Sequence, residues 1–256
     1  MGQSMRSPIV KSAIAASLIS LVLICSVTIF VMRKAPLTFA YYCPDCFGFD
    51  DMGEDVFVEP RLADIDRERL RNDIASARST VSKFYGQPVH SNRFIVCATG
   101  ACNEWVNGGS AKAFAVGDNL VYVSPAGRNE TILTHELAHV QLHAMLGDAA
   151  LDNVPAWFDE GLAVVVSKDD RYLQPSHSGL AACRIEDDGR PLPTSKSDWL
   201  DAAPVGDHMV YAWAACRVSS WLKIHDGAAG VKKAVDAIRS GRKFDASGSV
   251  AKFSSN

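Results

Sequence analysis

The pattern His135-Glu136-Leu137-Ala138-His139 constrains this chain more than any other feature of its sequence. Residues four apart lie on the same face of a helix, so the imidazole rings of His135 and His139 can reach one metal ion. Glu136 lies about 100° further round the helix, beside such an ion, where its carboxylate can take a proton from a bound water. The pattern also arises by chance, so its surroundings decide how it is interpreted.

The stretch around this pattern, residues 131–146, is predicted to be a buried helix. Two of its sides are apolar: Leu133, Leu137, Val140 and Ala144 on one, and Ala138, Leu142, Met145 and Leu146 on the other. A helix that is apolar almost all round is buried, and its polar groups then need a partner, which a metal ion supplies. The alternative is a surface helix with two solvated histidines. His143 lies one turn beyond His139, too far to join the same ion, and at most contacts a ligand.

A third metal ligand is expected downstream, because catalytic zinc usually takes three protein ligands and keeps one position for water. Residues 154–163 read Val-Pro-Ala-Trp-Phe-Asp-Glu-Gly-Leu-Ala. Pro155 suits the first turn of a helix, and Glu160 would then project from this helix toward the first one. Gly161 has no side chain and would let the two helices approach closely.

Two motifs therefore follow one another along the chain: His135-Glu136-x-x-His139 and Trp157-x-x-Glu160-Gly161-x-Ala163. Together they resemble the motifs of the gluzincin zinc metallopeptidases, above all the small peptidase MA-like families, over roughly residues 90 to 225. The resemblance implies that His135, His139 and Glu160 bind one Zn²⁺ ion. It also implies an α+β fold, a zincin-like domain with a small twisted sheet, an edge hairpin, an active-site helix and C-terminal helices. The metzincin pattern does not fit, because Leu142 and Met145 stand where it requires Gly and His.

The resemblance further implies hydrolysis of peptide bonds in a peptide or protein substrate. Glu136 would act as the general base, taking a proton from the attacking water and delivering it to the leaving amine. The alternative is a zinc-bound but inactive module that holds peptides or proteins of the cell envelope. The intact Glu136 favours the enzyme, because a pure binding module has no use for a base at this position.

A further catalytic group is expected on a helix predicted at residues 207–225. Relatives of this kind supply a Tyr or His there to stabilise the negative charge on the carbonyl oxygen. His208 and Tyr211 are three residues apart and can share one side of the helix. Tyr211 is favoured, because a neutral phenol donates without depending on protonation near pH 7. Alternatively, Tyr211 packs in the core with Trp213 and Trp221.

Residues 13–32, AIAASLISLVLICSVTIFVM, predict one membrane-spanning signal anchor. Twenty helical residues span about 30 Å, the thickness of a bilayer core. Residues 1–12 would form a cytoplasmic tail, 33–60 a juxtamembrane linker and 61–256 the metallopeptidase domain. The alternative is a cleaved signal peptide, whose apolar core would be shorter and whose cleavage site would follow closely.

The orientation of this anchor is not decided by the flanking basic residues, which number two on each side. The short N-terminus contains no acidic residue and most simply stays in the cytoplasm. The catalytic domain would then lie on the periplasmic or extracellular side of the cell membrane. A formal net charge of −3 without a basic stripe argues against nucleic acid as a partner.

The cysteines give weaker support to an exported domain. Six lie outside the apolar segment: Cys43, Cys46, Cys97, Cys102, Cys183 and Cys216. An even number fits disulfides in an oxidising compartment, with Cys97–Cys102 as the first expected pair and Cys183–Cys216 as the second. The alternative is a reduced protein in which Cys43 and Cys46 bind a metal or work in redox chemistry, although one C-x-x-C pair is only half a zinc site.

The remaining elements are predicted from periodicity and turn residues. A helix capped by Asp64 is expected to run to Tyr85, with one apolar stripe that recurs at spacings of three and four: Leu70, Ile74, Ala77, Val81 and Phe84. Residues 93–99 predict a strand, and residues 113–116 and 120–124 predict a hairpin with a three-residue turn. By resemblance, residues 120–124 would be the edge strand that pairs with substrate; otherwise they form an ordinary core strand.

Outside these elements, residues 38–60 are expected to be irregular. Asn129 should cap the metal-binding helix rather than carry a glycan. Residues 168–199 are rich in Pro, Gly, Ser and Asp and should form a largely irregular rim of the cleft. A short helix is expected at 231–238, followed by a polar tail.

Overall fold

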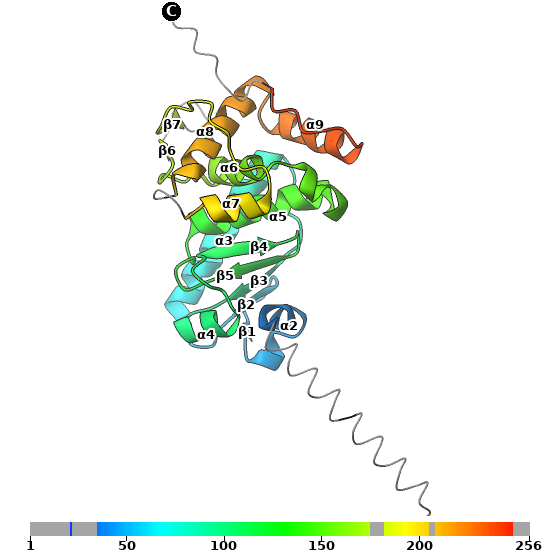
Figure 1. Ribbon diagram of the computed structural model, residues 1–256. Helices are drawn as coiled ribbons and strands as arrows, with labels where there is room; N and C mark the ends of the chain where they lie inside the picture. The colour runs from blue at the N-terminus through cyan, green and yellow to red at the C-terminus, as the bar shows by residue number, and fades with distance from the viewer. Residues whose placement is uncertain (1–20, 22–34, 175–181, 205–207, 248–256) are drawn as a thin grey trace, which may run out of the picture.

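The computed structural model describes residues 21, 35–174, 182–204 and 208–247 (Figure 1). Apart from Leu21, the predicted anchor at residues 13–32 lies outside the described residues. Within the described ranges, no helix is long and apolar enough to cross a membrane.

A five-stranded mixed sheet forms one layer of the domain. Its spatial order is β1 (Asp50–Asp51), β2 (Val56–Val58), β3 (Arg93–Val96), β5 (Leu120–Val123) and β4 (Ala113–Val116). The three inner strands are parallel, and β1 and β4 run antiparallel at the two edges. The expected mixture of helices with a small sheet is therefore present.

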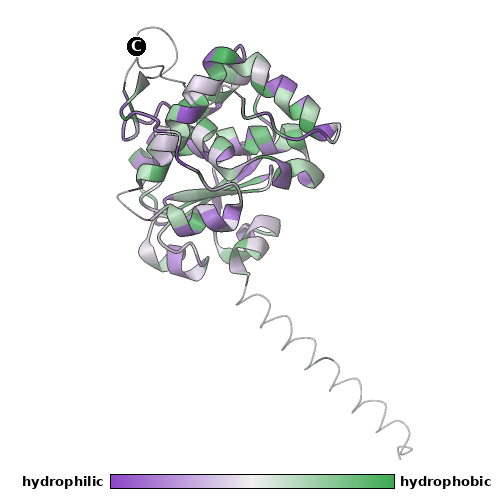
Figure 2. Ribbon diagram, turned by 45° about the horizontal axis from the view of Figure 1, so that its top comes forward, coloured by the Kyte–Doolittle hydropathy of each residue, from purple (hydrophilic) through white to green (hydrophobic). Residues whose placement is uncertain are grey.

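Alternate residues of the strands face two different helix layers, as the pleat of a strand requires. One face packs on the long helices α3 (Asp64–Tyr85) and α5 (Glu130–Leu146) in the main core cluster. The other face packs on the short helices α2 (Pro36–Tyr42) and α4 (Gly100–Trp105) in a smaller cluster. Figure 2 shows apolar and polar residues interleaved along the outer helices, as expected for helices with one buried face.

The C-terminal half is mainly helical and packs on the far side of α5. It consists of η2 (Asp148–Asn153), α6 (Ala156–Ser167), a small hairpin of β6 (Leu173–Gln174) and β7 (Ala182–Cys183), α7 (Lys196–Ala202), α8 (Met209–Ile224) and α9 (Ala228–Arg239). Helix α5 contacts both α3 and α6, and α6 lies along α8. The His-Glu-x-x-His motif on α5 therefore lies at the centre of the molecule rather than on its surface.

Several local predictions are confirmed. Helix α3 spans the expected residues, and its stripe of Leu70, Ile74, Ala77 and Val81 is buried while Phe84 packs against the core. Gly86 ends the helix in a left-handed conformation (φ 69°). The helix begins one residue earlier than a cap at Asp64 would require, since Ala63 occupies the N-cap position. The β4–β5 hairpin has the expected three-residue turn.

The prediction that residues 38–60 are irregular is wrong. Helix α2, the 3-10 turn η1 (Asp45–Phe47) and strands β1 and β2 occupy this stretch. Strand β2 is a structural member of the sheet, because Val56 pairs with Phe94 and Val58 with Val96. These strands are too short to show a period in the sequence, which is why the pattern did not reveal them.

Three cysteine pairs lie at disulfide distance. The Cα–Cα separations are 5.3 Å for Cys43–Cys46, 5.5 Å for Cys97–Cys102 and 5.1 Å for Cys183–Cys216, all within the usual range for a disulfide. Both expected pairs are thus present. The Cys43–Cys46 pair is a third.

The close approach at Gly161 involves a different helix from the one predicted. A Cβ atom at this position would lie 2.5 Å from the carbonyl oxygen of Ala214 and 2.8 Å from a methyl group of Val218. Both belong to α8, not to the histidine-bearing α5. The absent side chain therefore lets α6 lie against α8, and the expectation that Gly161 serves the contact with α5 is corrected.

Candidate metal centre

Helix α5 carries the His-Glu-x-x-His pattern and is buried, as predicted. The Asn129 side chain caps its start by accepting a hydrogen bond from the Ile132 backbone N–H at 3.1 Å. His139 and Glu136 are each only 7% exposed. The alternative of a surface helix with solvated histidines is therefore wrong.

Three ligand atoms converge between α5 and α6. The Nε2 atoms of His135 and His139 lie 3.1 Å apart, and the Glu160 Oε2 atom lies 3.5 Å from the first and 3.7 Å from the second. Tetrahedral bonds of roughly 2.0–2.1 Å would hold ligand atoms about 3.3 Å apart. The three residues predicted as ligands can therefore hold one small divalent ion, and the chemistry of two imidazoles and one carboxylate suits it.

Glu136 lies beside this group and contributes none of the three ligand atoms. Burial raises the pKa of the Glu136 carboxyl, against the opposing effects of His135, His139 and the backbone of Ala115. A carboxyl with a raised pKa is suited to taking up a proton and releasing it again. The position and environment of Glu136 thus match those of a general base.

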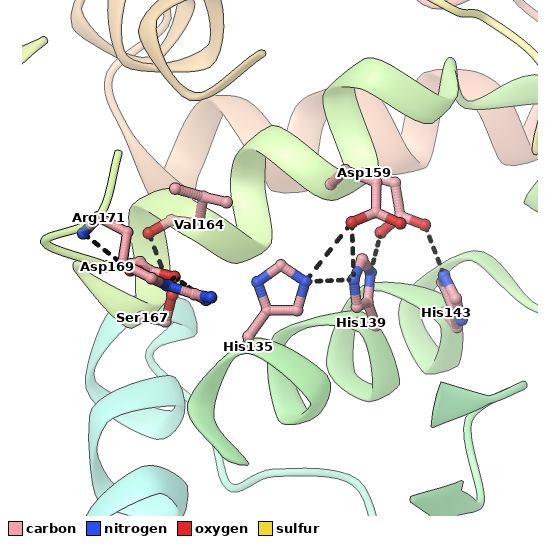
Figure 3. Close-up of polar contacts among 9 residues, drawn as sticks. His135, His139, His143, Asp159, Val164, Ser167, Asp169 and Arg171 are labelled. Carbon is pink, nitrogen blue, oxygen red and sulfur yellow. Dashed lines mark hydrogen bonds and ion pairs between the residues drawn. The ribbon is translucent and has the colours of Figure 1, made fainter. Parts of the chain in front are cut away.

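Asp159 contacts two histidines of the site, a role that its position in the sequence did not reveal. Its Oδ1 atom lies 2.6 Å from His139 Nδ1 and its Oδ2 atom 2.9 Å from His143 Nε2, as Figure 3 shows. The bond to Nδ1 directs the His139 Nε2 lone pair toward His135 and Glu160, because a ring nitrogen that donates cannot also bind the ion. The carboxylate therefore orients a ligand instead of acting as one.

His143 lies outside the three-ligand group, as its spacing predicted. Its Nδ1 atom lies 3.1 Å from the Gly117 carbonyl oxygen, so both of its ring nitrogens face acceptors. Burial works against the charge on Asp159, but His139 and His143 outweigh it and hold the pKa of Asp159 well below its usual range. His143 and Asp159 together form a fixed support behind His139.

A cleft of about 560 Å³ opens over the ligand atoms. Its walls come from strand β4, from the η2–α6 connection and from α7 and α8. The apolar part of its lining includes Phe114, Val154, Trp199, Leu200 and Tyr211. The predicted rim at residues 168–199 contributes its last part, including Thr194 and the start of α7. The three ligand residues, His135, His139 and Glu160, are therefore reached from this cleft.

The edge strand at this cleft is β4, not the predicted residues 120–124. Strand β5 lies between β3 and β4 and is an ordinary core strand, the alternative reading of that stretch. Strand β4 is the last strand of the sheet, and Lys112 O accepts a hydrogen bond from Ser124 N–H at 2.9 Å. Because backbone groups alternate along a strand, Ala113 and Ala115 direct theirs to the free edge. The hairpin was predicted correctly, but the strand at the edge of the sheet is β4 and not β5.

Tyr211 lies in the cleft beside the ligand atoms. Its ring is stacked on Tyr172 at 5.4 Å and meets Trp199 edge-on at 4.9 Å, with the His135 ring 6.5 Å away. Burial raises the pKa of the Tyr211 phenol, which therefore keeps its proton at neutral pH. The Tyr211 ring also packs against the core. Its aromatic neighbours there are Tyr172 and Trp199, not the Trp213 and Trp221 of the alternative prediction.

His208 occupies a different environment. It is exposed at the N-cap of α8 with φ 62°, and its Nδ1 atom lies 2.6 Å from the Ala203 carbonyl oxygen. Among the described residues that line the cleft, Tyr211 is present and His208 is not. The geometry therefore favours Tyr211 of the two predicted donors.

Comparison with protein-family models, with curated proteins and with solved structures finds no match to this chain. The gluzincin resemblance therefore rests on its two motifs and stays a prediction. The candidate metal centre rests on the convergence of its ligand atoms.

Proposed function

We propose that the chain is a membrane-anchored, zinc-dependent peptidase of the gluzincin type. The observation that supports it most strongly is the convergence of His135, His139 and Glu160 beside a buried Glu136 at the base of an open cleft. Residues 13–32 would anchor the chain in the cell membrane and leave the domain on the periplasmic or extracellular side.

His135, His139 and Glu160 would hold the zinc ion, which supplies a Lewis acid toward a water molecule and a peptide carbonyl when it is bound. Two imidazoles and one carboxylate leave room for such exogenous oxygen ligands, as in catalytic rather than structural zinc sites. Asp159 would keep the His139 ring in the orientation that this binding requires.

The substrate would enter as an extended peptide along β4. The outward backbone groups of Ala113 and the outward carbonyl of Ala115 would pair with it, and the apolar walls of the cleft would take its side chains. Glu136 would then remove a proton from the attacking water and return it to the leaving amine. The Tyr211 hydroxyl would donate a hydrogen bond to the carbonyl oxygen as negative charge develops there.

Replacement of Glu136 by Gln tests this proposal. The amide cannot take a proton but preserves the shape of the side chain, so zinc content should stay at the parent level while peptide turnover falls about 10²–10⁴-fold. The measurements are metal analysis and cleavage of a broad peptide library by the full chain. Glu130→Gln, in the first turn of the same helix, is the matched control and should leave both values unchanged.

The outcome also separates the enzyme from the inactive peptide-binding module. Parent protein that holds zinc but cleaves no member of the library would favour the binding module. Substantial turnover in Glu136→Gln with full zinc would show that another group acts as the base. Neither result would alter the assignment of the metal ligands, which is tested separately below.

A further inference from the structure

The folded domain begins almost directly after the predicted membrane span. Residues 13–32 end at Met32 and helix α2 starts at Pro36, so three residues lie between them. An extended chain advances at most about 3.6 Å per residue, which places Pro36 within about 14 Å of the end of the span. The headgroup layer beyond the bilayer core is itself roughly 5–8 Å thick. Helix α2 must therefore lie at or just above the lipid headgroups.

Helix α2 is fixed to the rest of the domain and cannot act as a flexible stalk. Its Ala40 is fully buried in the smaller core cluster, beneath the sheet. The Arg93 guanidinium of β3 donates a hydrogen bond to the Tyr41 carbonyl oxygen and lies 5.3 Å from the centre of the Tyr41 ring. The proximity of α2 to the bilayer therefore determines which end of the whole domain faces it.

That end carries aromatic side chains from three elements, which we call the aromatic face: the exposed Tyr42 of α2 and Trp105 of α4, and between η1 and α4 the partly buried Phe47, which also packs against the smaller core cluster. Tyr42 is 76% exposed and Trp105 is 41% exposed. Both carry large aromatic rings, which are usually buried. The Phe47 ring contacts Trp105 at a centroid distance of 5.2 Å, which joins η1 to α4. Figure 1 shows α2 and α4 at the same end of the molecule.

The charges on α2, η1 and α4 themselves do not favour attraction to anionic lipid. Asp45 and Glu104 are exposed on the same elements, and α2, η1 and α4 contain no Lys or Arg. Tyr and Trp, in contrast, favour the boundary between hydrocarbon and water, where an apolar ring and a polar tip are both satisfied. Partition of aromatic rings, rather than charge, would therefore supply the attraction.

We propose that the aromatic face of Tyr42, Phe47 and Trp105 inserts into the headgroup layer of the membrane that holds residues 13–32. The proposal rests on the anchor in the proposed function and is independent of hydrolysis. It sets the domain upright on the bilayer, with β4 and α7, which border the cleft, directed away from α2 and α4 (Figure 1). Substrate peptides would then reach the cleft from the aqueous side.

Fluorescence quenching in lipid vesicles tests the proposal. The full chain is reconstituted in phosphatidylcholine vesicles in which a fraction of the lipid carries a nitroxide on its headgroup. Trp105→Phe should abolish the quenched part of the tryptophan emission, because this ring would contact the headgroups. Trp213→Phe, on α8, is the matched control and should leave the quenching in place.

The results distinguish this inference from the proposals on which it depends. Quenching that is unchanged in Trp105→Phe, in a chain that sediments with the vesicles, would overturn the inference and leave the anchor intact. The face would then be covered by protein, a second copy of the chain included. A chain that does not sediment with the vesicles would overturn the anchor and the inference together. Trp105-dependent quenching in a chain without hydrolytic activity would support the inference while the peptidase proposal fails.

Discussion

The two nitrogens of the His139 ring each face one carboxylate and one further histidine, but the two groups of side chains differ in their hydrogen bonding. On the cleft side, Nε2 meets a second histidine, His135, and a carboxylate, Glu160. On the inner side, Nδ1 meets a carboxylate, Asp159, which in turn meets another histidine, His143. Either trio could be taken for a metal site by composition and distance alone.

The difference lies in what the ligand atoms already contact. On the inner side, both Asp159 oxygens bond to ring nitrogens and the remaining nitrogen of His143 bonds to Gly117. On the cleft side, two imidazole nitrogens and a carboxylate oxygen point toward a common position that the cleft leaves open. The clustering of ligand residues therefore does not by itself define a metal site; their remaining bonding capacity does.

The largest expected effect is on the cleft side. Glu160→Ala removes a ligand, so zinc affinity should fall by more than the roughly 10–100-fold that is usual for residues behind the ligands. Metal analysis and competition with a chelator measure the change. Glu104→Ala, at an exposed position on α4, is the control and should retain full zinc. Full zinc occupancy in Glu160→Ala would indicate Asp159 as the ligand. The metal site would then lie on the inner side of His139 rather than on the cleft side.

The second effect concerns the Tyr211 hydroxyl on the same side. Tyr211→Phe keeps the stacking on Tyr172 and removes one hydrogen-bond donor, so turnover should fall about 10²–10³-fold with zinc retained. His208→Ala should have little effect, because His208 is exposed outside the cleft. Kinetic measurements on both variants decide between them. If Tyr211→Phe stays near parent turnover while His208→Ala collapses, the role belongs to His208; two active variants would exclude both.

On the inner side, Asp159→Asn should weaken zinc binding by about 10–100-fold without abolishing it. The amide keeps the size of the side chain but loses the charge that orients His139. A zinc titration compares this variant with the parent and with Asp152→Asn, an exposed acid at the cleft. Unchanged affinity in Asp159→Asn would mean that packing alone orients the His139 ring.

The smallest effect on metal is expected from His143→Gln, which should weaken zinc binding less than Asp159→Asn does. The change removes the contacts to Asp159 and Gly117, so it should instead lower the free energy of unfolding by about 1–3 kcal/mol. Denaturant unfolding of the zinc-free protein measures this, with His90→Gln at an exposed position as control. A loss of zinc equal to that in Glu160→Ala would place His143 among the ligands.

Much of this architecture could be predicted from the sequence because it is local. The spacing of His135 and His139 fixes their common face on any helix, and the apolar stripe of α3 fixes its buried side. The roles of Asp159 and Glu160 could not be assigned in full from their positions. These neighbours point about 100° apart, and which one meets the Nε2 atoms depends on how α6 lies across α5. The bonding of Asp159 follows from that packing.

The two errors in the sheet have the same origin. Strand β4 precedes β5 in the chain but lies outside it in space, because β5 pairs with β3. Strand β2 joins the sheet by pairing with β3, more than thirty residues later. Strand order depends on contacts between distant residues, and a periodicity read along the chain does not contain them.

Gly161 has a consequence for how the site comes apart. The backbone contact that it permits joins α6, which carries Glu160, to α8, which carries Tyr211. Two helices packed this closely tend to open as one cooperative unit rather than separately. The amide hydrogens of α6 and α8 should then exchange with solvent at similar opening free energies. A fluctuation that releases the carboxylate from the ion position would carry the phenol away with it, so a half-assembled centre would be rarely populated.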